Sequence, residues 1–466
     1  MPLGRGEIES INAASLRILQ TLGVRVQSDS VLELLRKHGC VDAADAHTVR
    51  IPPGLVEEAL RMAPRRVRLC TLGGQERLLG PGAGSTFWTC NALNIIEGES
   101  IRPIGEQDFI DWVRVTDSLE SVFAAVAPSV ADYPAQFRDF VGFRLLSQYS
   151  TKHLRPCIYT PRGALAIIEM AGVLLGGIAP AQRPIVSFGY TIQSPLQWSA
   201  PAMELFHITS GHGIPLMINA EPTAGATAPV TLAGTLALAN AEALSGVVIA
   251  QLLEPGRPLV YNLGFSHTLD MRSAITRTGG PENALLGAAG AQLAAYHGLP
   301  SASWAGTESM TEDSQAAAEF ALVASAHAAA GVNIIWGVGQ LETQRAISLT
   351  QGVIDDEIAA AILHIQRGVQ VDADTLAEDV IATMGHSADY LAHEHTLCHF
   401  RDELFMPRLA FTQRWEAWRQ QGRRSLRDRA RQRVADVLAR PAECRLSPDV
   451  QRELLSVQKR WMQRLQ

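Results

Sequence analysis

The chain has 466 residues, of which 47% are hydrophobic and 19% are charged, so it carries enough apolar material for a large globular core. The formal net charge of -7 gives no electrostatic reason to expect a nucleic acid as a partner. The first eleven residues include Arg5, Glu7 and Glu9 and contain no apolar run of the kind that a signal peptide needs. Six scattered cysteines without a CxxC pair are typical of reduced thiols, so the composition favours a cytoplasmic protein.

Helical periodicity dominates the start of the chain. Helices are expected over residues 6–22, 28–38 and 52–62. Gly23 is a suitable terminator for the first helix, and the pair Pro52-Pro53 is a suitable opening for the third. From residue 65 to 102 the periodicity becomes two, which predicts short strands separated by glycine-rich turns. We expect residues 1–80 to form an N-terminal helical cap.

A strand–helix repeat follows. Strands are expected near 85–89, 121–127, 154–160, 184–190, 214–220, 258–264, 300–304 and 332–336. Helices are expected near 106–118, 136–149, 161–176, 199–211, 230–254, 281–297, 313–330 and 350–367. Several strands are nearly continuous apolar runs, as in parallel strands that are buried on both faces. Eight such pairs predict an α/β protein with a (β/α)8 TIM barrel over 81–369. A doubly wound sheet is disfavoured because no GxGxxG follows an early strand.

The C-terminal region, residues 370–466, is expected to contain only helices. They are predicted over 375–384, 394–406, 413–421, 426–438 and 448–465. Between Arg401 and Arg440 there are eleven arginines against five acidic residues. This pattern fits a solvated helix face or a docking surface for an acidic protein partner, and the sequence leaves both open.

Several stretches resemble the trimethylamine methyltransferase family, whose members pass a methyl group from an amine to a corrinoid protein. They are ILQTLGVRVQSDSVLELLRKHGC, VRIPPGLVEEALRMAP, TAGATAPVTLAGTLALANAEALSGVVIAQLLEPGRPLVYN, GTESMTEDSQAAAE, AGVNIIWGVGQLE, VIDDEI, EHTLCHFRDELFMPRL and WEAWRQQG. The resemblance runs in register from near residue 8 to near residue 430. It implies a barrel fold and a corrinoid-binding partner protein that supplies cobalamin, with no cofactor bound permanently by this chain.

One departure from the family pattern bears on the substrate. The archaeal trimethylamine enzymes carry pyrrolysine at the barrel mouth, and no position of this sequence is pyrrolysine. The chain therefore resembles the branch without pyrrolysine, whose members demethylate quaternary amines such as glycine betaine. The resemblance implies a small quaternary or methylated amine as substrate and makes trimethylamine itself less suitable.

Methyl transfer from a quaternary ammonium needs an aromatic cage for the cation, and a carboxylate can assist. The candidate residues at the ends of strands four to eight are Phe188, Tyr190, Asn219, Glu221, Asn262, Phe265, Trp304, Glu308, Trp336 and Gln340. Glu221, Glu308 and Gln340 are the catalytic candidates, and the others, with His386, are substrate-binding candidates. For any single aromatic, core packing is the alternative explanation. The two glutamates can also be solvated or cap a helix.

The histidines suggest a second class of function. His395 and His399 are four residues apart on an expected helix, and His393 lies close in sequence, so a zinc-dependent barrel hydrolase is one alternative. The absence of HExxH favours structural histidines and no metal site. A family member that binds a betaine without turnover is another alternative. The helical C-terminal region makes a homo-oligomer plausible.

Overall fold

The eight extended segments of the repeat form one closed barrel of parallel strands. A computed structural model describes residues 1–43, 45–98, 100–386 and 389–465. The strands follow one another around the barrel in chain order: β6 (Thr86–Thr89), β9 (Val122–Val126), β10 (His153–Arg155), β11 (Phe188–Ile192), β13 (Leu216–Ala220), β15 (Leu259–Gly264), β18 (Ser301–Trp304) and β19 (Ile334–Val338). Strand β19 pairs with β6, and a parallel bridge between Leu154 and Val186 joins β10 to the β11 segment. The TIM-barrel prediction is confirmed.

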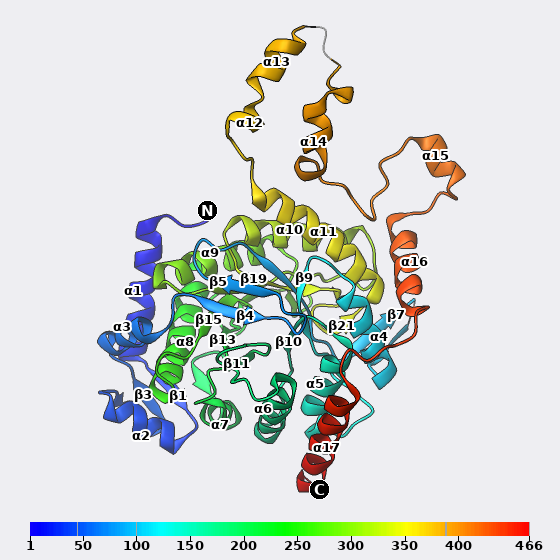
Figure 1. The fold of residues 1–466 in the computed structure, drawn as a ribbon. Coiled ribbons are helices and arrows are strands. Elements are labelled where there is room, and N and C mark those ends of the chain that lie inside the picture. Colours follow the sequence, from blue (N-terminus) through cyan, green and yellow to red (C-terminus); the bar gives the residue numbers. More distant parts are fainter. Residues whose placement is uncertain (44, 99, 387–388, 466) are drawn as a thin grey trace.

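Eight helices surround the strands (Figure 1). They are α4 (Glu106–Asp117), α5 (Arg138–Tyr149), α6 (Pro161–Leu175), α7 (Ala200–Thr209), α8 (Leu232–Leu253), α9 (Pro281–His297), α10 (Ser314–Ala329) and α11 (Leu349–Arg367). Side chains cap several of their first turns, as where Thr160 accepts from Gly163 N–H and Asp313 accepts from Ala316 N–H. Helix α8 has the length and apolarity to cross a membrane, but 83% of its most apolar window is buried inside the molecule. It is the helix to which the N-terminal region attaches.

The N-terminal region contains the three expected helices and a small sheet that the sequence did not predict. Helices α1 (Arg5–Thr21), α2 (Asp29–Lys37) and α3 (Pro53–Met62) pack against α8. The sheet has the order β12-β1-β3-β2, with β1 (Val24–Val26), β2 (Val41–Asp42), β3 (Thr48–Arg50) and β12 (Gln197–Trp198). These strands are too short to show a periodicity of two, and β1 forms by pairing with β12 of the barrel region.

A hairpin of β4 (Val67–Cys70) and β5 (Glu76–Leu79) covers the amino end of the barrel. Cys70 N–H donates to Pro184 O at 2.9 Å, and Asn333 Nδ2 donates to Gly80 O at 3.0 Å. Pro184 and Asn333 both precede barrel strands, so these contacts lie at the amino end. The opposite end of the barrel is therefore the one available to a site.

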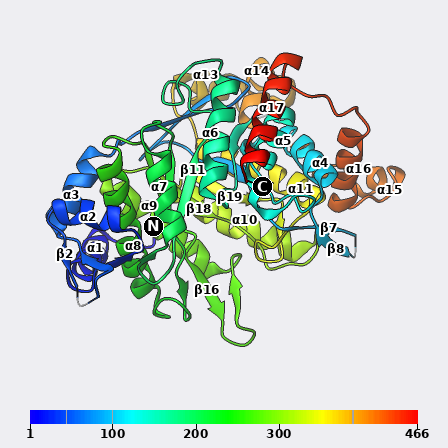
Figure 2. The same cartoon turned by 90° about the horizontal axis from the view of Figure 1, so that it is seen from below.

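Two hairpins rise at the carboxyl end of the strands. Strands β7 (Asn94–Glu97) and β8 (Ser100–Pro103) follow β6 and pair with each other. Strand β7 also pairs with β21 (Ala346–Ile347), which in turn pairs with β20 (Gln340–Leu341). Strands β16 (His267–Asp270) and β17 (Ile275–Arg277) follow β15 and project from the barrel, with β14 (Thr223–Ala224) beside β16 (Figure 2). They form one wall of the barrel mouth.

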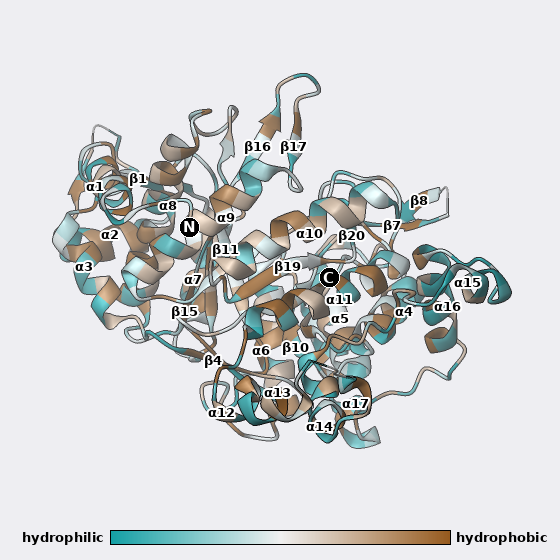
Figure 3. Ribbon diagram, turned by 90° about the horizontal axis from the view of Figure 1, so that it is seen from above, coloured by the Kyte–Doolittle hydropathy of each residue, from teal (hydrophilic) through white to brown (hydrophobic). Residues whose placement is uncertain are grey.

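The C-terminal region is helical, as predicted. Its elements are α12 (Ala373–Leu376), α13 (Glu378–Met384), a short 3-10 turn over Tyr390–Ala392, α14 (Glu394–Glu403), α15 (Trp415–Gln420), α16 (Leu426–Leu438) and α17 (Pro448–Leu465). Another short 3-10 turn, Ala135–Phe137, precedes α5 in the barrel. Helix α16 packs against α4 and α11, and α17 packs against α5 and α6. Helices α12 to α14 lie at the end of the molecule where β4 lies, opposite β16 and β17 (Figure 3). We keep 1–80, 81–369 and 370–466 as a proposed domain division.

Candidate functional site

Four aromatic side chains gather inside the barrel. The rings of Trp304 and Trp336 are stacked with centroids 5.8 Å apart, and Phe265 lies edge-on to both, at 5.2 Å and 5.6 Å. Trp88 lies 5.3 Å from Trp336 on its other side. All four are buried, and three of them were predicted for the site. The fourth, Trp88, belongs to the first strand, where the aromatic pair in TFWT was the signal that sequence reasoning missed.

Gln340 fixes the orientation of Trp304. The indole Nε1 of Trp304 donates to Gln340 Oε1 at 3.0 Å, and Gln340 Nε2 donates to Thr307 O at 3.0 Å. Gly306 makes this possible, because a Cβ at that position would lie 1.9 Å from Gln340 Oε1. Gln340 therefore reaches the aromatic cluster and acts on it through Trp304.

A chain of polar side chains crosses strands β11, β13 and β15. Asn262 Nδ2 donates to Asn219 Oδ1 at 2.9 Å, and Asn219 Nδ2 donates to Thr191 Oγ1 at 3.2 Å. Thr191 Oγ1 in turn donates to Glu221 Oε1 at 3.4 Å. Burial raises the pKa of Glu221 to about 7, because the surrounding protein removes water from its carboxylate. The structure therefore brings Asn219, Asn262 and Glu221 together at the carboxyl ends of adjacent strands.

A second acid, Glu242, lies near Glu221 and was missed by the sequence analysis. It is on α8, is fully buried, and accepts hydrogen bonds from Ser194 Oγ at 2.8 Å and Leu196 N–H at 2.9 Å. Burial raises its pKa to about 7, and the charge of Glu221 acts in the same direction. Its only sequence signal was an acidic residue inside an otherwise apolar helix.

A buried arginine also lies among these residues. Arg155, at the end of β10, is 5% exposed, and its Cζ lies 5.3 Å from the centre of the Trp336 ring. Its Nη1 donates to Ser187 O at 2.9 Å. Burial lowers the pKa of Arg155 to about 10. The sequence analysis missed this residue, although an arginine inside a buried strand was a possible signal.

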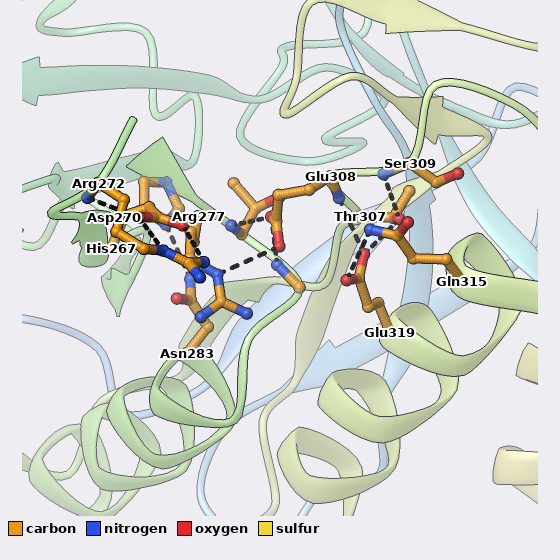
Figure 4. A network of polar contacts seen from close by, with 12 residues as sticks. His267, Asp270, Arg272, Arg277, Asn283, Thr307, Glu308, Ser309, Gln315 and Glu319 are labelled. Carbon is orange, nitrogen blue, oxygen red and sulfur yellow. Dashed lines mark hydrogen bonds and ion pairs between the residues drawn. The ribbon is translucent and has the colours of Figure 1, made fainter. Parts of the chain in front are cut away.

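Glu308 is held in a network at the rim of the mouth (Figure 4). It accepts hydrogen bonds from Gly279 N–H at 2.8 Å and from Thr278 Oγ1 at 3.1 Å, and it forms an ion pair with Arg277 at 3.7 Å. The backbone N–H of Glu308 donates to Glu319 Oε2 at 2.9 Å. Glu308 thus connects the loop after β18 to the segment that leaves β17.

Three predicted residues lie apart from the cluster. Tyr190 points toward α7, since its hydroxyl is 2.8 Å from Thr209 Oγ1 and its ring centre is 5.0 Å from that of Phe206. Phe188 lies two residues earlier in the same strand and so faces the same way. His386 is exposed and follows directly after α13, a helix that lies on the side of the molecule opposite β16 and β17 (Figure 3).

The late histidines form no cluster with the barrel mouth. The rings of His395 and His399 lie 4.3 Å apart, and His399 Nε2 is 3.5 Å from Asp374 Oδ2. Across residues 1–43, 45–98, 100–386 and 389–465, no group of three His, Cys, Asp or Glu side chains has a geometry suited to a metal ion.

The arrangement inside the barrel can bind an organic cation. Faces of indole and phenyl rings attract cations, and the attraction is stronger where water is excluded, as it is here. Glu221 can supply a negative charge at the carboxyl ends of the strands, and the two asparagines can supply fixed dipoles.

The sequence model of the trimethylamine methyltransferase family (MTTB) matches residues 1–464. This chain belongs to the trimethylamine methyltransferase family. Within the family, it is 29% identical over 444 residues to the trimethylamine methyltransferase MttB of Desulfitobacterium hafniense, a match that covers 93% of this chain and 88% of the relative. It is 28% identical over 467 residues to a glycine betaine methyltransferase of the same species, covering 97% and 95% of the two chains.

Solved structures support the fold. The monomethylamine methyltransferase MtmB of Methanosarcina barkeri matches with a TM-score of 0.53 at 13% identity, covering 93% of this chain and 94% of that one. A hydroxylamine complex of MtmB matches with a TM-score of 0.54 at 12% identity. The family and the fold thus agree with the resemblance found in the sequence, and the relatives named here are methyltransferases that act on amines.

Proposed function

We propose that this chain transfers a methyl group from a small quaternary amine of the glycine betaine type to the Co(I) corrinoid of a partner protein. The observation that carries the proposal is the buried cluster of Trp88, Trp304, Trp336 and Phe265 inside the barrel. Family membership supports the reaction class, and one relative is a glycine betaine methyltransferase.

The reaction needs little acid–base chemistry from the protein. The corrinoid is the methyl acceptor, so two electrons from Co(I) form the new carbon–cobalt bond. The electron pair of the carbon–nitrogen bond stays on nitrogen, and a neutral tertiary amine leaves without a proton. The protein must hold the ammonium, exclude water and aim one methyl group out of the mouth.

The residues of the site fit these tasks. The stacked indoles and Phe265 offer aromatic faces to the ammonium from one packed cluster, and Gln340 keeps Trp304 in place. Glu221 balances the charge of the bound ammonium. The loss of that positive charge in the transition state weakens the interaction, so Glu221 serves binding and specificity more than rate. In this proposal Glu308 keeps the rim of the mouth ordered.

We further propose a protein partner, self-association and a cellular location for this chain. A corrinoid protein docks at the mouth, and copies of this chain associate as a homo-oligomer. A cytoplasmic location agrees with the six cysteines, which are all unpaired in the structure.

The test is turnover with purified components. The protein is mixed with Co(I) cobalamin or a corrinoid protein and with glycine betaine, proline betaine, carnitine, choline or trimethylamine, and methyl-Co(III) is followed by its absorbance. We expect methylation of cobalt from one quaternary amine and much less from trimethylamine. Zinc and a chelator are included as controls. Amine binding without cobalt methylation would favour a family member that binds a betaine without turnover. Hydrolytic activity that is lost on chelation would favour a zinc-dependent barrel hydrolase.

A further inference from the structure

We infer that Arg155 and the indole N–H of Trp336 form a receptor for a carboxylate, so that the substrate is a zwitterion bound with its carboxylate deep in the barrel. This inference rests on the proposed function, because it concerns the same group of residues inside the barrel. It separates betaines from quaternary amines that carry no negative charge, such as choline.

Arg155 is a buried cation that the described part of the chain leaves without a counter-ion. A guanidinium has five N–H donors, and that of Arg155 makes one hydrogen bond, to a backbone carbonyl. The other two deeply buried arginines, Arg257 and Arg144, have side-chain oxygens as partners. Arg257 lies 3.5 Å from Glu254 Oε2, and Arg144 donates to the side-chain oxygens of Gln148 and Gln458. A buried charge is costly unless it is paired, so Arg155 requires an anion from elsewhere.

Trp336 supplies a second donor without an acceptor. Its Nε1 is buried and has no hydrogen-bond partner in the structure. By contrast, the Nε1 groups of Trp88, Trp198 and Trp304 all donate to side-chain oxygens, at 3.2, 2.9 and 3.0 Å. Arg155 lies over the ring of the same Trp336. A carboxylate has two oxygens and can accept from both donors at once.

The wall of the barrel leaves room for the guanidinium. A Cβ at Gly189 would lie 1.8 Å from Arg155 Nη2, so only glycine permits this arginine conformation. Gly189 is in register with Met217 of β13, and Asn219 lies two residues farther toward the carboxyl end. Two residues of a strand span about 6.6 Å, so the asparagines lie one layer nearer the mouth and Glu221 lies beyond them.

These layers orient the ligand. A betaine with its carboxylate at Arg155 has its ammonium nearer the mouth, at the level of the asparagines, and Glu221 lies beyond it. Trp336 belongs both to the carboxylate receptor and to the aromatic cluster. Arg155 lies over its ring, and Trp304 and Phe265 pack against the same ring. The N-methyl groups then face the opening, as transfer to an external acceptor requires. A ligand with only a positive charge leaves Arg155 unpaired and is repelled by it.

The first experiment needs no variant. Binding of glycine betaine, its neutral-ester analogue glycine betaine methyl ester, and choline is measured by calorimetry on the full-length protein. We expect glycine betaine to bind at least tenfold more tightly than either cation. Equal affinities for the three compounds would overturn the inference.

Variants then assign the effect to Arg155. Arg155→Gln is expected to weaken glycine betaine binding at least tenfold and to leave choline binding unchanged or stronger. Arg155→Lys should restore part of the affinity. Arg144→Lys, a change at a buried arginine outside the barrel, is the matched control and should bind as the wild type does. Unchanged betaine affinity in a folded Arg155→Gln protein would contradict the assignment.

The outcomes separate this inference from the proposed function. Methylation of cobalt from choline and glycine betaine with equal efficiency would contradict the carboxylate receptor and support the methyltransferase function. Selective, Arg155-dependent binding of betaine without cobalt methylation would support the carboxylate receptor and contradict the methyltransferase function.

Discussion

Trp304 and Gln340 are linked by a hydrogen bond of 3.0 Å between the indole Nε1 and the amide Oε1, although they come from segments that follow different strands. Both residues are buried, so no water replaces either partner. This link bears on the aromatic cluster, because Trp304 packs against both Trp336 and Phe265. A side chain predicted as catalytic is therefore better described as a positioning residue.

This relationship predicts the effect of Gln340→Leu. The variant leaves the buried Nε1 of Trp304 without an acceptor, which costs roughly 1–3 kcal/mol of unfolding free energy. Glycine betaine binding should weaken as well, because the indole is no longer fixed. Urea denaturation and calorimetry measure the two effects. Gln315→Leu, at an exposed position, is the control and should change neither quantity. Retention of both properties in Gln340→Leu would show that the hydrogen bond does not position Trp304.

The raised pKa of Glu221 predicts pH-dependent binding of the amine. The pKa of this carboxyl is about 7, so below pH 7 it is mostly protonated and offers no charge to the ammonium. The affinity for glycine betaine should therefore rise as the pH increases from 5.5 to 8.5 and should level off at the upper end. Glu221→Gln should remove most of this dependence. Calorimetry across the pH range provides the measurement, and an unaltered profile in the variant would exclude Glu221 as the titrating group.

Glu242 makes a separate prediction about stability. Its pKa is raised from 4.5 to about 7 by burial, so between these pH values the folded protein holds a proton that the unfolded chain has lost. The unfolding free energy contributed by this group therefore falls as the pH rises from about 4.5 to about 7 and is constant above that range. Glu242→Gln should flatten the decline.

Urea denaturation at pH 5, 6, 7 and 8 tests the effect of Glu242. The glutamine can still accept from Ser194 or Leu196, so the variant should fold. Glu204→Gln, a change at an exposed acid on α7, is a suitable control and should retain the wild-type slope. Equal slopes in all three proteins would mean that Glu242 does not titrate in this range.

The sequence predicted the barrel because burial on both faces leaves a local pattern. Strands such as Leu216–Ala220 and Leu259–Gly264 are apolar nearly throughout, and each is followed by a helix with its own periodicity. The small N-terminal sheet left no such pattern. Its strand Val24–Val26 has three residues, and its partner Gln197–Trp198 lies far away in the chain.

The site was predicted less completely, for two physical reasons. Trp304, Trp336 and Asn219 could be assigned to strand ends from the sequence. The sequence does not show whether a side chain on such a strand points into the barrel or toward the helices. Tyr190 faces α7 because the register of β11 places Gly189 on the inside. Arg155 and Glu242 were missed because their significance depends on contacts between distant segments: a buried cation without a partner and a buried acid on a helix.

The arginine-rich segment illustrates the same limit. The sequence left a solvated face and an acidic partner as alternatives. In the structure Arg427 lies 2.7 Å from Glu312 Oε2, and Arg431 lies 3.7 Å from the same atom. Glu312 is in the loop after β18 and is buried. At least part of the positive charge thus attaches α16 to the barrel.

Glu308 provides the last prediction, which separates a structural role from a catalytic one. Its carboxylate accepts from the Gly279 N–H and the Thr278 hydroxyl, so it holds the segment after β17 against the loop after β18. Glu308→Ala should release the β16–β17 hairpin and raise hydrogen exchange of its amides at least several-fold. The KM for glycine betaine should rise with it, because the hairpin forms one wall of the mouth.

The control for Glu308 is Asp270→Asn, which removes the local ion pair with Arg272 near the hairpin tip. This change leaves the attachment at Glu308 intact, so exchange in the hairpin should remain close to that of the wild type. If Glu308→Ala abolished cobalt methylation while hairpin exchange and betaine affinity stayed at wild-type values, Glu308 would act on the reaction itself. A parallel change in exchange and KM would instead establish that it orders the mouth, and would leave Glu221 as the acid that faces the ammonium.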